Sequence, residues 1–115
     1  MDLVELGEFD ASVAKRPAML ARVFTARELA YCRARPRPLE HLAARFAAKE
    51  AAMKAVGTGW GQGVGWRDAE VLSAPGKRPE LRVRGALRAH AGPGRFEVSL
   101  SHSGGYAVAM VVFSR

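Results

Sequence analysis

Apolar residues recur at helical spacing in the middle of the chain. Because a helix advances about 100° per residue, residues three or four positions apart share one face. The residues on this face are Leu42, Phe46, Met53 and Val56. We therefore expect one long helix over about 39–56, with Gly57 as a natural C-terminal stop.

Four charged residues of this predicted helix form an unusual pattern. Lys49 falls in the middle of the apolar face, and Arg45 lies on one edge of it. Glu50 and Lys54 lie one turn apart along the other edge. In one interpretation, Lys49 extends to solvent, and Glu50 and Lys54 form a surface ion pair worth roughly 0.2–0.5 kcal/mol. In the other, the helix holds an anion and a divalent metal at the rim of the core.

The chain before this helix predicts a short strand and two further helices. Residues 2–6 alternate as in a strand, and 11–23 have helical spacing, with Pro17 in a first turn or at a break. Thr25 and the glutamate three residues later form a capping box, which predicts a helix over about 26–34.

The chain after the central helix predicts mainly strands. We expect strands at about 68–73 and 80–84, a short helix at 85–91, and strands at 95–101 and 106–113 joined by a hairpin at Ser103-Gly-Gly105. The last strand is apolar on both faces and should be central. The pattern predicts an α+β fold in a single small domain over 1–115, with an antiparallel sheet packed against one long central helix.

The glycine-rich stretch after the helix matches no common phosphate-binding loop. Glycine occupies every second position from Gly57 to Gly65, without the ending of a P-loop or the spacing of a dinucleotide fingerprint. We expect its outer half to be a flexible loop.

Composition narrows the class of protein. The chain has 115 residues, a formal net charge of +7 and no apolar stretch long enough to span a bilayer. Its start is acidic at Asp2 and Glu5, unlike a secretory signal, and its single cysteine, Cys32, has no internal disulfide partner. We therefore expect a cytoplasmic protein, with Cys32 buried as a small hydrophobic residue.

The positive charge favours anionic partners without choosing among them. Nucleic acid, membrane surfaces, phosphorylated ligands and acidic proteins all fit. The basic residues are spread along the chain, and no zinc-ligand spacing or RNA-binding strand pattern occurs. We accordingly expect neither a nucleic-acid nor a membrane partner, and a basic nucleic-acid-binding module is kept as an alternative.

Four blocks of sequence occur in a characteristic order. They are Asp2-Leu-Val-Glu-Leu6, Phe24-Thr-Ala-Arg-Glu-Leu29, Arg45-Phe-Ala-Ala-Lys-Glu-Ala-Ala-Met-Lys54 with Gly57-Thr-Gly59, and Val98-Ser-Leu-Ser-His102. In this order and at these distances the chain resembles the holo-acyl-carrier-protein synthases, the small bacterial-type phosphopantetheinyl transferases. The resemblance covers nearly the whole chain, and its central block is the most specific part.

The resemblance implies a magnesium-dependent transfer of 4′-phosphopantetheine. The group would pass from coenzyme A, the co-substrate, to a serine of an apo acyl carrier protein, releasing 3′,5′-ADP. Asp2 and Glu50 match the family's Mg²⁺ ligands, and Asp2 or a metal-bound water beside it would accept the serine proton. Lys54 matches the lysine that reaches the pyrophosphate, which completes the catalytic set.

The resemblance also implies a nucleotide site. Arg45 and His102 match positions that contact the 3′-phosphate or the nearby nucleotide, and Gly57 and Thr58 would border the ligand. Lys49 would serve the same nucleotide or pair with a buried acid. The other two histidines, His41 and His90, match no family position and are expected at the surface.

A basic patch on the first helices is expected to dock the carrier. Carrier proteins are acidic along the helix that follows their modified serine, so a basic surface would steer and orient them. The docking residues would be Lys15, Arg16, Arg22 and Arg27. The alternative is ordinary surface charge. The carrier could serve fatty acid, polyketide or peptide synthesis.

Two expectations concern the whole molecule. Enzymes resembling this chain form homotrimers with the nucleotide site at the subunit boundary, which suits a chain with little surface to enclose a large ligand. Family members carry several residues before the aspartate, whereas only Met1 precedes it here. That departure indicates a truncated or misassigned start, and leaves a catalytically impaired coenzyme-A-binding domain from a larger multienzyme as a second alternative.

Overall fold

The computed structural model describes residues 1–59 and 61–115, so Trp60 of the glycine-rich stretch lies outside the described residues. The helices are α1 (Leu6–Lys15), α2 (Met19–Val23), α3 (Ala26–Arg33), α4 (Pro38–Val56), the single 3₁₀ turn η1 (Trp66–Asp68) and α5 (Gly85–Ala91). The strands are β1 (Asp2–Glu5), β2 (Ala69–Leu72), β3 (Glu80–Val83), β4 (Arg95–Ser103) and β5 (Tyr106–Ser114). This is the predicted α+β fold.

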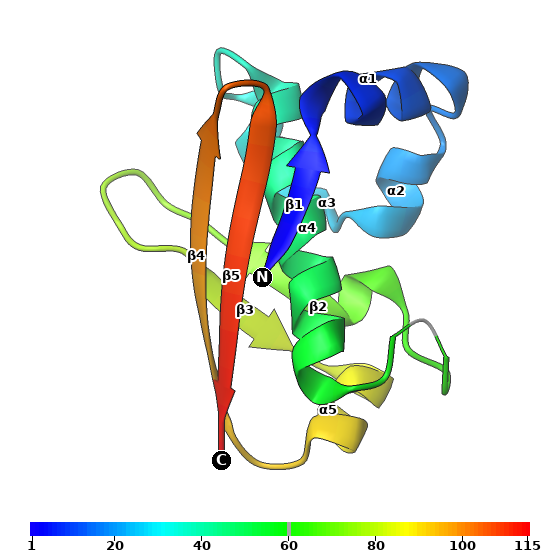
Figure 1. Cartoon of the computed structure of the whole chain (residues 1–115), viewed down its shortest axis with the longest axis vertical. Helices are drawn as coiled ribbons and strands as arrows, with labels where there is room; N and C mark the ends of the chain where they lie inside the picture. Colours follow the sequence, from blue (N-terminus) through cyan, green and yellow to red (C-terminus); the bar gives the residue numbers. More distant parts are fainter. Residues whose placement is uncertain (60) are drawn as a thin grey trace.

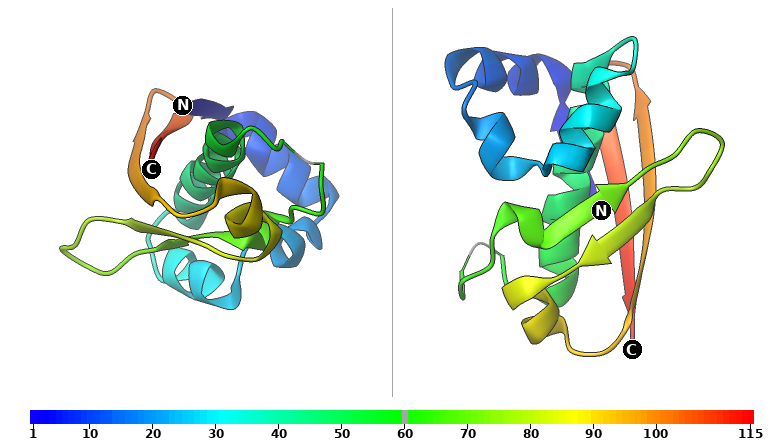
Figure 2. Two further views of the ribbon diagram at one scale, coloured as in Figure 1. Left: turned by 90° about the horizontal axis from the view of Figure 1, so that it is seen from below. Right: turned by 180° about the vertical axis from the view of Figure 1, so that it is seen from behind.

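The described strands form two antiparallel ladders rather than one sheet. Strands β1, β5 and β4 pair in that order, so β5 is central, as its apolar sequence predicted. Strands β2 and β3 pair separately. Helix α4 lies along the larger sheet, with α1, α2 and α3 grouped towards one end of the molecule and β3 and α5 towards the other (Figures 1 and 2).

Helix α4 approaches the sheet through small side chains. The buried alanines of α4 are Ala43, Ala44, Ala47, Ala48, Ala51 and Ala52. They belong to the same two buried clusters as Ala107 and Ala109 of β5. Because each of these side chains is a single methyl group, the backbones of helix and strand can approach closely where they meet.

The first predicted helix was wrong in its bounds. The chain forms α1 and α2, separated at residues 16–18, so of the two alternatives for Pro17 the break is confirmed. Helix α1 also begins earlier, because the carboxylate of Glu5 accepts hydrogen bonds from the backbone N–H groups of Gly7 and Glu8 at 2.9 and 2.8 Å.

Two predicted helix ends are confirmed. The capping box of α3 is present: Thr25 Oγ1 accepts from the N–H of Glu28 at 3.2 Å, and the Glu28 carboxylate accepts from the N–H of Thr25 at 2.9 Å. Gly57 ends α4 in the left-handed conformation with φ of 90°. Cys32 is buried, as expected.

The outer face of the larger sheet carries exposed apolar side chains. Met110 and Val112 of β5 are each 51% exposed, and Leu3 of β1 and Tyr106 of β5 are exposed as well. Strand β5 is therefore apolar on both faces but covered on only one within this chain. In the described part of the chain, no helix combines the length and the apolar character that crossing a membrane requires.

Candidate active site

An acidic cluster forms where β1 passes α4. The ammonium of Lys54 lies 2.6 Å from Oδ1 of Asp2, which joins the first strand to the last turn of the helix. The Asp2 side chain is only 13% exposed, whereas that of Lys54 is 63% exposed. The other carboxylate oxygen of Asp2, Oδ2, is buried and has no hydrogen-bond partner among the described residues.

Glu50 belongs to the same cluster. Burial of its carboxylate raises the pKa of Glu50, the negative charge of Asp2 raises it further, and Lys54 partly offsets both effects. The pKa of Lys54 is raised in turn by its hydrogen bond to Asp2 and by the charge of that carboxylate. Two partly desolvated carboxylates beside one lysine form a site that favours an added cation.

The donor set of this cluster suits a hard divalent ion that is partly coordinated by its substrate. The described residues contain no group of three or more side chains placed to hold a metal. Magnesium is commonly held by one or two carboxylates, with water and substrate phosphates completing its octahedron. The unpartnered Oδ2 of Asp2 and the raised pKa of Glu50 fit such an ion.

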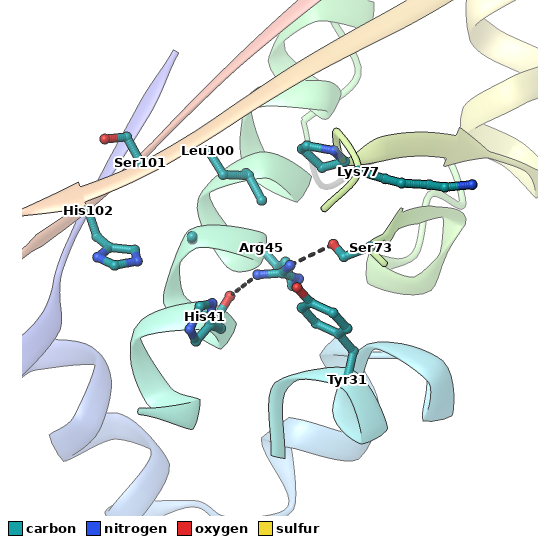
Figure 3. A pocket seen from close by; sticks show the side chains of 10 residues that line it. Tyr31, His41, Arg45, Ser73, Lys77, Leu100, Ser101 and His102 are labelled. Atoms are coloured by element: carbon teal, nitrogen blue, oxygen red, sulfur yellow. Dashed lines mark hydrogen bonds between the residues drawn. The ribbon is translucent and has the colours of Figure 1, made fainter. Parts of the chain in front are cut away.

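A second site lies on another side of α4, around Arg45. The Arg45 side chain lines a cavity of about 220 Å³ between α3, α4, β4 and the β2–β3 turn (Figure 3). Its guanidinium donates to the carbonyl of His41 at 2.9 Å and to Oγ of Ser73 at 2.6 Å, and lies over the ring of Tyr31. Arg45 is 4% exposed, and its Nε has no hydrogen-bond partner among the described residues.

His102 lines the same cavity from β4. Its Nδ1 lies 3.7 Å from a carboxylate oxygen of Glu40, and its ring meets that of His41 edge to face. Arg45 and His102, which the resemblance assigned to one nucleotide site, therefore line the same cavity. A cavity with a buried guanidinium and two imidazoles is suited to an anion.

Sequence reasoning missed several residues of this cavity. His41, expected at the surface without a role, lines it one turn before Arg45 on the same helix, so the spacing of four residues was an available signal. Tyr31, Ser73 and Lys77 also line it. They come from α3 and from the β2–β3 turn, and no local pattern places them beside α4.

Lys49 does not face either site. Its side chain is completely buried, and its ammonium lies 2.8 Å from Oε1 of Glu28. It also donates to the carbonyls of Ala69 and Trp66, at 2.6 and 3.2 Å. The expected nucleotide contact of Lys49 is therefore replaced by the other alternative, a pair with a buried acid, because no side of this ammonium is open to a ligand.

The residues expected to dock the carrier separate into two places. Lys15, Arg16 and Arg22 line one groove of about 810 Å³, whose apolar lining includes Met19, Phe46 and Trp66. Arg27 is not among its lining residues. It pairs instead with the buried carboxylate of Glu70 at 2.8 Å, which Thr25 and Arg84 also contact.

Gly57 and Thr58 lie at the end of α4, just beyond Lys54. A Cβ added at Gly57 would meet nothing within 4 Å, so the backbone there is open to a neighbour. The hydroxyl of Thr58 donates to the carbonyl of Gly59 at 3.2 Å. Both residues follow the last turn of α4, and neither is among the residues that line the Arg45 cavity.

Comparison with known sequences gives one consistent result. Residues 1–111 match the family model of the 4′-phosphopantetheinyl transferase superfamily. The chain is 45% identical to the holo-acyl-carrier-protein synthase of Moorella thermoacetica, over 97% of this chain and 89% of that protein. It is 41% identical to the enzyme of the same name from Geotalea daltonii, over 100% of this chain and 95% of that protein.

Solved structures agree with the sequence matches. The structure resembles the holo-acyl-carrier-protein synthase of Neisseria meningitidis with a TM-score of 0.87 at 32% identity, over 99% of this chain and 94% of that chain. The Helicobacter pylori enzyme, solved in complex with coenzyme A, gives a TM-score of 0.85 at 25% identity, over 98% and 96% of the two chains.

Proposed function

Because the chain belongs to the 4′-phosphopantetheinyl transferase superfamily, we propose that it acts as a holo-acyl-carrier-protein synthase. It transfers 4′-phosphopantetheine from coenzyme A to a serine of an apo acyl carrier protein. The observation that carries this proposal is α4, a single helix that presents Glu50 and Lys54 to Asp2 and, on another side, Arg45 to an anion-binding cavity.

The reaction exchanges one phosphorus–oxygen bond for another. The serine hydroxyl oxygen bonds to the phosphorus that carries pantetheine, and the bond from that phosphorus to the bridging oxygen of the pyrophosphate breaks. The products are the phosphopantetheinyl serine, 3′,5′-ADP and the proton of the serine hydroxyl. Negative charge grows on the leaving phosphate, beside which the ammonium of Lys54 would lie.

Asp2 and Glu50 would hold the magnesium ion that the reaction requires. When bound, the ion would polarise the phosphoryl oxygens and balance the charge of the departing phosphate. Asp2 holds Lys54 by the ion pair at 2.6 Å, which orients the lysine towards the same ligand. The Oδ2 atom of Asp2, which is buried and has no hydrogen-bond partner among the described residues, would be the oxygen that holds the ion, and a water beside Asp2 would accept the serine proton.

Arg45 and His102 would bind the nucleotide end of coenzyme A. A guanidinium held from two sides, by the His41 carbonyl and by Ser73, is already oriented before a phosphate arrives. Arg45 and Glu50 are five residues apart on α4, about 7.5 Å along the helix axis. The same five residues turn the helix by about 140°, so the two side chains face different sides of α4, which fits the nucleotide site at a subunit boundary that the resemblance implies.

The basic groove would dock the carrier protein. Lys15, Arg16 and Arg22 supply positive charge, and Met19 and Phe46 supply apolar contact area within the same groove. This combination matches an amphipathic helix with an acidic face, which is the surface expected beside a carrier's modified serine. Arg27, which is paired with Glu70, contributes long-range charge rather than a contact in the groove.

We also propose a homotrimer in the cytoplasm. The exposed apolar face of β5, with Met110 and Val112, would be covered by neighbouring copies. The single cysteine, Cys32, is free and buried, as suits a reducing compartment.

The test is a direct assay of transfer. The protein is incubated with Mg²⁺, coenzyme A and apo carriers of fatty acid, polyketide and peptide synthesis, and each carrier is examined for the phosphopantetheine mass shift. We expect a shift on at least one carrier that is lost on adding EDTA and falls by on the order of 100-fold or more in Glu50→Gln. The outcome with each carrier identifies the pathway served.

Two other outcomes correspond to the alternatives. Tight binding of coenzyme A with no mass shift on any carrier indicates a catalytically impaired coenzyme-A-binding domain. Steeply salt-dependent binding to generic DNA, without coenzyme A binding, indicates a nucleic-acid-binding module.

A further inference from the structure

We infer that His41 is a further substrate-binding residue, which contacts the 3′-phosphate of the nucleotide together with His102 and Arg45 and takes up a proton when that phosphate binds. This inference rests on the proposed function, because it assigns the 3′-phosphate to the Arg45 cavity. It concerns a residue that lies outside the four sequence blocks that carry the family resemblance.

The geometry places two imidazoles at one wall of the cavity. His41 lies on α4 and His102 on β4, and their ring centroids are 5.6 Å apart with the planes at 82° (Figure 3). Arg45 follows His41 by one helical turn and is held by the His41 carbonyl. A group that binds between these side chains would therefore meet both rings and the guanidinium.

The cavity has donor capacity that its own residues do not use. The Nε of Arg45 is buried without a partner among the described residues. Buried polar groups are normally satisfied, and an unsatisfied donor on a side chain that lines a cavity points to a ligand. A terminal phosphate has three acceptor oxygens, enough to engage the guanidinium and both imidazoles.

The charges around His41 favour its neutral form until an anion arrives. Burial lowers the pKa of His41, and the positive charges of Arg45, His102 and Arg35 lower it further, while Glu40 opposes them. Lys77, from the β2–β3 turn, lines the same cavity. A bound phosphate dianion reverses this balance, because it attracts the protonated imidazole and screens it from Arg45.

Binding of a 3′-phosphate should therefore be linked to proton uptake. Its affinity should rise as the pH falls from about 8 towards 6.5, and should level off near the second pKa of the phosphate, about 6. A nucleotide without the 3′-phosphate should show neither effect. His41 would thus help the enzyme to distinguish coenzyme A from its 3′-dephospho form.

Calorimetry of product binding tests this directly. The titrants are 3′,5′-ADP and 5′-AMP, measured from pH 6.5 to 8 in buffers of different ionisation enthalpy, which report the protons taken up. We expect the unmodified protein to prefer 3′,5′-ADP and to take up protons with that ligand only. His41→Gln should weaken 3′,5′-ADP binding about tenfold, as expected for loss of a charged hydrogen bond, and reduce its proton uptake.

Two further variants make the result specific. His90→Gln changes the other histidine without an assigned role, whose ring lies 3.2 Å from the Gln62 carbonyl, and should leave binding unchanged. His102→Gln should weaken binding but retain proton uptake, since His41 is still present. This second variant tests the inference even where His41→Gln fails to fold.

Failure of the His41 inference can be distinguished from failure of the proposed function. If the unmodified protein does not prefer 3′,5′-ADP to 5′-AMP, the assignment of the Arg45 cavity in the proposed function is wrong, and the inference is overturned with it. If the preference exists but His41→Gln keeps both the affinity and the proton uptake, only the role of His41 is overturned. Loss of all proton uptake in His102→Gln would likewise overturn it.

Discussion

At the scale of single residues, the ionised carboxylate of Glu50 lowers the free energy of unfolding of the metal-free protein. Glu50 lies partly buried beside Asp2, so the folded state resists its ionisation. Since the pKa of Glu50 is raised on folding, the folded protein binds its proton more tightly than the unfolded chain does. The stability that this proton contributes is present below the unfolded pKa and is lost as pH rises through the folded one.

Glu50→Gln should therefore raise the melting temperature of the metal-free protein while it abolishes activity. The gain should be small at pH 4.5 and grow as the pH rises to 7.5, because only the unmodified protein acquires the unfavourable charge. Thermal unfolding in EDTA across this pH range provides the measurement. A melting temperature at pH 7.5 that is lower in the variant would show that Glu50 stabilises the fold.

At the scale of elements, the buried pair of Lys49 and Glu28 fastens α4 to its neighbours. The carboxylate of Glu28 also accepts from the backbone N–H groups of Thr25 and Val71, both at 2.9 Å. The pair thus joins α4 to the start of α3 and to β2. Rotation of α4 would break the Lys49–Glu28 ion pair, so this pair helps to keep Glu50 and Arg45 directed at their separate sites.

Removing one partner of this pair should be costly. Lys49→Met leaves a buried carboxylate without its cation, and we expect a loss of about 3–5 kcal/mol in the free energy of unfolding, measured with urea. Adding Glu28→Gln should recover part of this loss by removing the buried charge. It should not recover all of it, because the amide oxygen can accept from only one of the two backbone N–H groups and the amide nitrogen only donates.

Lys54→Met is the matched control on the same helix. The ammonium of Lys54 is mostly exposed to water, so its loss should lower the free energy of unfolding by much less than the loss of the fully buried ammonium of Lys49. A comparable loss in both variants would contradict the special importance of the buried pair.

The sequence predicted most elements because their signals are local. The capping box before α3, the apolar face of α4 and the glycine that ends it each lie within a few residues of the feature they determine. The start of α1 was missed because Glu5, read as part of the first strand, also caps the following helix. Separation of the strands into two ladders depends on packing, which spacing does not encode.

The same limit explains the candidate sites. Arg45, Glu50 and Lys54 were located by helical periodicity and by the resemblance. The partner of Lys49 is 21 positions earlier in the chain, and Ser73 reaches Arg45 from the β2–β3 turn. Only the folded chain brings these groups together.

At the scale of the whole molecule, two surfaces remain for partners: the outer face of the sheet and the basic groove. The first carries the exposed apolar side chains of β1 and β5, as in an interface between copies. Met110→Glu should convert a trimer to monomers, which light scattering after size exclusion would show, because it buries a charge at that interface. Arg33→Glu, at an exposed position on α3, should leave the trimer intact. A monomeric and active unmodified protein would overturn the proposed assembly.

The basic groove should control recognition of the carrier rather than chemistry. The double change Arg16→Glu and Arg22→Glu should raise KM for the carrier about tenfold or more, with a smaller effect on kcat. The reason is that long-range attraction between the basic groove and an acidic carrier acts on the encounter and orientation of the two proteins. The advantage of the unmodified protein should shrink as salt rises.

Two comparisons define the extent of this docking surface. Arg27→Gln should have a smaller effect than the double reversal, since Arg27 is paired with Glu70 outside the groove. If the double reversal weakens coenzyme A binding as much as it weakens carrier recognition, these arginines belong to the nucleotide site instead.

The alanine contact between α4 and β5 has a consequence for the metal site. Asp2 lies opposite Ala109 in the β1–β5 ladder, and Ala109 shares a buried cluster with Ala48 and Ala52 of α4. The thickness of these methyl groups therefore sets the width of the gap across which the carboxylates of Asp2 and Glu50 meet. Magnesium holds its ligands at about 2.0–2.1 Å and accepts little deviation. One added methylene in this layer would shift the two carboxylates relative to each other and weaken binding of the proposed magnesium ion, while the fold around them persists.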